Sequence, residues 1–146
     1  MDIQIQPKMG KRSPPDWMTW LNNGDQYFKA ATPTGKKSRF GTDLRYNLLS
    51  MSLEGYIMAI SGYHKMLPDN HTYTDLMDGL ERVIPVDPSL KARILQHESI
   101  QSICSLEDYH RSHPSETVLT ELKEAIAEIA KIAHKTCSPD FRKEKG

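Results

Sequence analysis

Apolar residues recur at helical spacing in five stretches of the chain, and the longest of these stretches covers residues 42–67. Steps of three and four residues place its main apolar side chains on one helical face. They are Leu49, Leu53, Tyr56, Ile60, Tyr63 and Leu67, and that face is widened by Leu48, Met51, Ile57 and Met58. A helix that is apolar around much of its girth is typically buried on several sides. We therefore expect a central helix that is capped by Thr42 and ended by Pro68.

A first helix is predicted over residues 14–31, after a start signal at Ser13 and two prolines. Its apolar face carries Trp17, Trp20, Leu21, Phe28 and Ala31. The Asn-Asn-Gly sequence at 22–24 has weak helix propensity. We expect packing against a neighbour to hold this part of the helix, with a kink as a second possibility.

Three further helices are predicted in the second half of the chain. A short helix covers 74–83 and is capped by Thr72 or Thr74, and a fourth begins at Pro88 after an Asp87 cap and extends to about residue 110. The last begins at Ser115, and its apolar stripe is Val118, Leu122, Ile126, Ile129 and Ala133. No stretch has the alternating pattern of a strand.

These patterns predict an all-α fold: an up-and-down, antiparallel helical bundle of about five helices with short loops. Residues 13–137 form its single domain, residues 1–12 form a flexible N-terminal arm, and residues 138–146 form a loose tail.

Composition narrows the class of protein. The 146 residues carry no net charge at pH 7, so the overall balance favours neither nucleic acid nor an anionic membrane. No apolar run is long enough to span a membrane, and the first residues lack the apolar core of a signal peptide. Two cysteines are too few for a disulfide framework or a Cys-rich zinc site. We expect a soluble cytoplasmic protein with reduced thiols and without a metal or other cofactor.

Two clusters carry candidate chemistry. Four cations, Lys36, Lys37, Arg39 and Arg45, lie within ten residues and are a candidate phosphate- or nucleic-acid-binding site, with a solvated basic loop as the alternative. A polar cluster of Glu107, His110 and His113 follows later in the chain. Its Glu-x-x-His pair resembles a metal-binding pair, but bundle metal sites use two such pairs and further carboxylates. Histidines at a helix end are the alternative, because they complement the helix dipole, as does His134 on the last helix.

The order of helices resembles that of the HEPN domain family. The resemblance covers roughly residues 14–135, and three segments carry it: DWMTWL in the first helix, LPDNHTYTDLMDGLERV after the central helix, and SLEDYHRSHPSETVLTELKEAIAEIAKIAHK at the end. In the second segment His71 precedes Leu76 and Leu80, and in the third Tyr109, Arg111 and Pro114 approximate an Arg-Tyr-Pro-like element.

The resemblance implies either a ribonuclease or a binding module. Active members carry an arginine, a spacer of about four to six residues and then a histidine, and no arginine of this chain has a histidine at that spacing. Arg93 and His97, with three residues between them, come nearest. The resemblance therefore favours a non-catalytic homodimeric module that binds a nucleotide, RNA or a nucleotidyltransferase partner. Two alternatives stay open: a metal-independent ribonuclease in which Arg93 and His97 are catalytic, and an unrelated helical bundle with a structural or ligand-binding role.

Overall fold

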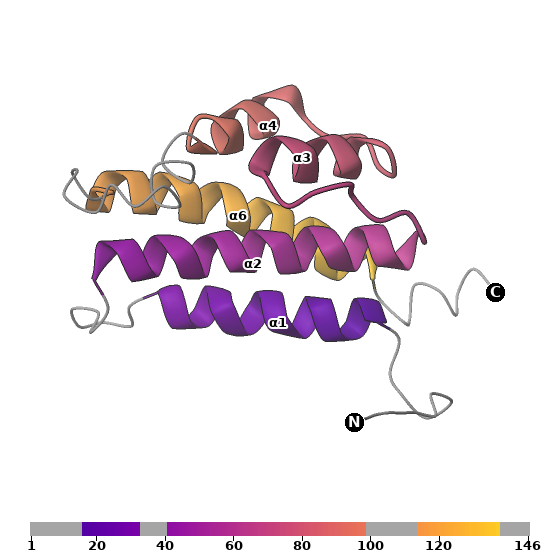
Figure 1. The fold of residues 1–146 in the computed structure, drawn as a ribbon, viewed down its shortest axis with the longest axis horizontal. Coiled ribbons are helices and arrows are strands. Elements are labelled where there is room, and N and C mark those ends of the chain that lie inside the picture. The colour runs from indigo at the N-terminus through magenta and orange to yellow at the C-terminus, as the bar shows by residue number, and fades with distance from the viewer. Residues whose placement is uncertain (1–15, 33–40, 99–113, 138–146) are drawn as a thin grey trace.

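A computed structural model describes residues 16–32, 41–98 and 114–137, and Figure 1 shows its fold. Within these residues the chain forms an all-α helical bundle, as predicted. Its helices are α1 (Asp16–Ala31), α2 (Thr42–Tyr63), α3 (Tyr73–Glu81), α4 (Pro88–Leu95) and α6 (Glu116–Thr136). The predicted arm and tail lie outside the described residues, as do residues 99–110. The prediction of one continuous fourth helix to about residue 110 is wrong, because α4 ends at Leu95 with Gln96 as its C-cap.

Helix α2 is the central helix of the bundle, and α1, α3 and α6 all pack against it. Most of its predicted apolar face is buried: Leu49, Leu53, Tyr56 and Ile60 are each at most 2% exposed. The stripe of α6 is buried in the same core, apart from the half-buried Val118. The pattern of the sequence thus identified both the central helix and the faces that cover it.

The directions of the helices follow from the contacts along α2. Helix α1 runs antiparallel to α2, because Trp17 packs near its end and Gly24 near its middle. Helix α6 runs parallel to α2: Arg45 and Glu116 join the beginnings of the two helices, whereas the Cys137 Sγ–H donates to the Ala59 carbonyl near their ends. In Figure 1 the short helices α3 and α4 lie above α2 and α6, on the side away from α1. The consecutive helices α1 and α2 are therefore antiparallel, as predicted, whereas α2 and α6, which are not consecutive, are parallel.

Both ends of α2 differ from the prediction. Gly41, not Thr42, is the N-cap, and no side-chain hydrogen bond caps the helix. The helix ends at Tyr63, before the predicted end at Pro68, and Lys65 adopts a left-handed conformation with φ of 60°. A residue in that conformation cannot continue an α-helix. As a result Leu67, which was predicted to lie on the buried face, is 53% exposed.

The weak Asn-Asn-Gly segment of α1 is held by close contact with α2. An added Cβ on Gly55 would lie 2.8 Å from the Gly24 backbone nitrogen, so the two backbones meet with no room for a side chain. The Ser52 hydroxyl donates to the Gly24 carbonyl over 2.9 Å. Packing therefore compensates for the poor helix propensity, as expected.

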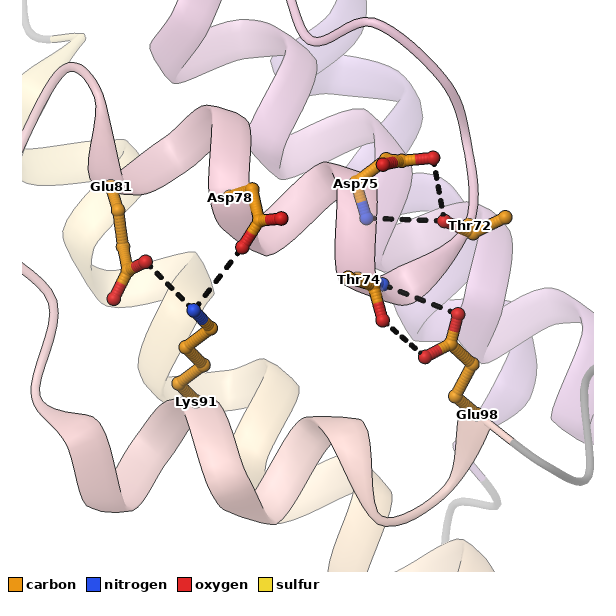
Figure 2. A network of polar contacts seen from close by, with 7 residues as sticks. All are labelled: Thr72, Thr74, Asp75, Asp78, Glu81, Lys91 and Glu98. Carbon is orange, nitrogen blue, oxygen red and sulfur yellow. Dashed lines mark hydrogen bonds and ion pairs between the residues drawn. The ribbon is translucent and has the colours of Figure 1, made fainter.

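A network of polar contacts joins α3 to α4 and to the residues that follow it (Figure 2). The Lys91 ammonium of α4 binds Asp78 at 3.2 Å and Glu81 at 2.8 Å on α3, and both contacts raise the pKa of Lys91, that with Glu81 the more. Thr74 donates from its hydroxyl to Glu98 beyond the end of α4. These contacts fix the two short helices as a pair.

The predicted N-caps of α3 and α4 are confirmed: Thr72, the first of the two candidates for α3, accepts from the Asp75 amide, and Asp87 accepts from the Ser89 amide. Ser115, predicted as the first residue of the last helix, is instead its N-cap and accepts from the Val118 amide. In the described part of the chain, no helix is both long enough and apolar enough to cross a membrane.

Candidate functional site

Arg93, one half of the candidate catalytic pair, lies on α4 and faces α6. Its guanidinium Nη1 is 2.8 Å from the Glu128 carboxylate. The Arg93 side chain is 37% exposed and that of Glu128 is 47% exposed, so solvent reaches the pair. The positive charge of Arg93, which would bind a phosphate, is therefore already paired with the carboxylate of Glu128.

His97, the other half of the pair, is buried beyond the end of α4. It is 4% exposed, and the Tyr46 hydroxyl donates to its backbone carbonyl over 2.8 Å. Burial lowers the pKa of the imidazole, and the Glu121 carboxylate opposes that effect. Its Nε2 has no hydrogen-bond partner among the residues that the structure describes. His97 is therefore a neutral imidazole in the protein interior, while Arg93 lies at the surface.

Of the four basic residues predicted to contact phosphates, the structure describes Arg45. Its side chain is 10% exposed, and its Nη1 is 2.8 Å from Glu116 at the start of α6. Arg45 thus connects two helices. Lys36, Lys37 and Arg39 lie outside the described residues.

The polar cluster of Glu107, His110 and His113 also lies outside them. Within 16–32, 41–98 and 114–137, no group of three or more His, Cys, Asp or Glu side chains is placed so that it could hold a metal ion.

A pocket of about 370 Å³ lies between α1 and α6. Both helices pack on α2 but contact one another much less, which leaves a groove between them. Helix α1 lines it with Trp17, Met18, Leu21, Asn22 and Asp25, and the end of α6 adds His134 and Cys137. Its volume is within the range of small-molecule sites, and its wall combines apolar side chains with a few polar groups.

Asp25 is the polar centre of this pocket. Its Oδ1 accepts from the Tyr56 hydroxyl at 2.6 Å and lies 2.9 Å from the His134 Nε2. Burial raises the pKa of Tyr56, and the hydrogen bond to Asp25 adds to that effect, so the phenol stays protonated and donates. A side chain from each of α2 and α6 therefore orients one carboxylate on α1.

Cys137 lines the same pocket as Asp25 and His134, but its thiol is not a nucleophile. It is 1% exposed, and burial raises the pKa of its thiol to about 12. Since the thiolate is the reactive form, the thiol is inert near neutral pH.

The contact of Asp25, Tyr56 and His134 was not predicted from the sequence. Asp25 is separated from Tyr56 by 31 residues and from His134 by 109. His134 was interpreted as a complement to the helix dipole. The one local signal is an acid placed directly after the Asn-Asn-Gly segment, where α1 comes closest to α2.

Comparison of the chain with models of protein families, with curated proteins and with solved structures finds no match.

Proposed function

We propose that this chain is a non-catalytic, HEPN-like helical module of the cytoplasm, which pairs with a second copy of itself and binds a nucleotide, RNA or a nucleotidyltransferase partner. The order of its helices and the long central helix support the family resemblance. The observation that carries the proposal is an uncharged apolar strip on the first half of α2.

This strip consists of Leu44, Leu48 and Met51. Their spacing of four and three residues places them on one face of α2. Leu44 is 45% exposed and Met51 is 42% exposed, while Leu48 is half-buried against the core. Exposed apolar side chains that line up on a central helix are typical of an interaction surface. In a homodimer with a twofold axis, the strips of the two copies pack against one another, and both apolar faces are buried.

The placement of Arg93 and His97 favours binding over catalysis. General acid–base cleavage of RNA needs an imidazole within hydrogen-bond reach of the reacting hydroxyl, and a cation beside the phosphate. The imidazole is buried and the guanidinium is paired with Glu128. Both groups would have to change their surroundings before they could act on a phosphodiester.

Sedimentation velocity of the full chain tests this function, with Leu44→Glu and Met51→Glu as variants. Each variant places a carboxylate in the apolar strip, so we expect a dimer in the wild type and a monomer in both variants. Met66→Glu is the matched control, since Met66 is 48% exposed but lies after α2. A monomeric wild type, or variants that still dimerise, would contradict the proposal.

The ribonuclease remains the second candidate because of two observations. Arg93 is partly exposed, and the buried Nε2 of His97 has no partner among the described residues. Cleavage of single-stranded RNA by the purified chain, lost in Arg93→Ala and in His97→Ala, would replace the binding module with this enzyme.

A further inference from the structure

The pocket between α1 and α6 presents one half-satisfied carboxylate beside an apolar wall. Both hydrogen bonds that Asp25 receives end on Oδ1, and in the described part of the chain Oδ2 has no hydrogen-bond partner. The Asp25 side chain is 43% exposed. Oδ2 is thus free to accept a hydrogen bond from a molecule that enters the pocket.

The surroundings hold this carboxylate in place. The Tyr56 hydroxyl comes from the buried core of α2, since Tyr56 is 2% exposed, and because the phenol stays protonated it donates to the carboxylate. His134 contacts the same oxygen from α6. An acceptor fixed by two other helices is preorganised, and such an acceptor loses little conformational freedom when a ligand binds.

Apart from Asn22, the remaining α1 side chains that line the pocket are apolar. Trp17, Met18 and Leu21 of α1 line the pocket, and Met18 is 41% exposed. The thioether of a methionine adapts to ligands of different shape. This surface suits a compact hydrocarbon or aromatic group rather than a second charge.

We propose that the pocket binds a small primary amine carried on a compact apolar body, with its ammonium donating to Asp25 Oδ2. A charge-assisted hydrogen bond of this kind is stronger than a bond between neutral groups. The carboxylate repels an anionic ligand of the same shape. Because the Cys137 thiol is buried and stays protonated, the polar groups that the described pocket offers to a ligand include those of Asn22, Asp25 and His134. This inference does not depend on the proposed dimer, because the strip on α2 and the pocket have no residue in common.

The test uses the full chain and 2-phenylethylamine as the probe, at about pH 8, where alkylamines are protonated and ordinary histidines are neutral. Binding is followed by isothermal titration and by amide NMR shifts. We expect saturable binding with a dissociation constant of about 1 mM or below. The shifts should centre on Trp17, Asp25 and His134. The neutral 2-phenylethanol and the anionic phenylacetate should bind about tenfold more weakly or not at all.

Two variants separate recognition from folding. Asp25→Asn keeps an oxygen that can accept from Tyr56 but removes the charge, and it should weaken amine binding about tenfold. Met18→Lys places a cation at the pocket and should abolish binding, whereas Met66→Lys should leave it unchanged. Circular dichroism checks that each variant is folded. Equal binding of the three probes, unchanged affinity in Asp25→Asn or Met18→Lys, or no saturable binding of the amine would overturn the inference.

Discussion

Gly24 and Gly55 let the backbones of α1 and α2 approach one another more closely than side chains would permit. A Cβ on Gly55 would lie 2.8 Å from the Gly24 nitrogen and 3.0 Å from the Trp20 carbonyl oxygen. All of these atoms belong to the backbone of α1, so no side-chain rotation can relieve the contact. The absence of a side chain at Gly24 also leaves room for the Tyr56 ring, whose hydroxyl reaches Asp25 on the same helix α1.

We expect Gly55→Ala to destabilise the fold by about 1–3 kcal/mol, because the methyl group forces the helices apart. Urea unfolding followed by circular dichroism measures this change. Gly62→Ala on the same helix is the control, since the nearest atom to its added Cβ is 3.7 Å away. That variant should be neutral, or more stable by up to about 1 kcal/mol through helix propensity. An equal effect of the two substitutions would contradict the close crossing.

His97 is expected to make stability depend on pH. Burial lowers its folded-state pKa from the ordinary value of 6.5, so the unfolded chain binds the proton more readily. The contribution of neutral His97 is therefore present above that ordinary value and is lost as the pH falls through the lowered pKa. Free energies of unfolding measured between about pH 7 and pH 5 should fall less steeply in His97→Leu than in the wild type.

The exposed His64 provides the control for this prediction. His64→Gln should keep the pH dependence of the wild type, because that side chain is exposed at the end of α2. If His97→Leu and the wild type lost the same free energy on acidification, His97 would not be the buried titrating group.

Asp25, Tyr56 and His134 mark the limit of prediction at this scale. Apolar spacing correctly placed Tyr56 on the buried face of α2. Apolar spacing does not predict which polar group the hydroxyl of Tyr56 will contact on another helix. The partner depends on the depth of the helix crossing, which Gly24 and Gly55 set together.

The beginnings of α3 and α4 were more predictable than that of α2, where the predicted Thr42 cap is wrong. Thr72 and Asp87 cap α3 and α4 as expected, because capping is a local contact between a side chain and an amide two or three residues away. The end of α2 was less predictable. Pro68 is a strong stop signal, but the helix ends five residues earlier because Lys65 takes a left-handed conformation.

The cap of α6 gives a prediction at the scale of the element. Ser115→Ala removes the acceptor for the Val118 amide at 3.1 Å and should cost about 1 kcal/mol of stability. Thermal or urea unfolding measures the loss. Thr120→Ala, an exposed change within the same helix, should stay within about 0.5 kcal/mol of the wild type. Similar stabilities for both variants would show that the cap contributes little.

At the scale of the whole molecule, apolar periodicity identified the helices that surround α2, but not the direction of α6. Periodicity identifies a buried face without saying which neighbour covers it or which way that neighbour runs. The contacts from Arg45 to Glu116 and from Cys137 to Ala59 supply this information. These two contacts between α2 and α6 depend on the path that the chain takes through α3 and α4. The polar contacts of Lys91 and Glu98 fix the orientation of these two short helices.

In the proposed dimer, two copies pair through the first half of α2. Pulsed dipolar spectroscopy measures the distance between spin labels on the two copies. One label is attached to Asn47→Cys, at the exposed edge of the strip. The Cys104→Ser substitution removes the other cysteine apart from Cys137, which is buried and stays unlabelled. Two helices that pack about 8–10 Å apart should give a narrow distance of roughly 20–30 Å between labels on different copies. A label on His64→Cys should give a longer or broader distribution. If the Asn47→Cys label showed no dipolar coupling between copies, this pairing would be contradicted.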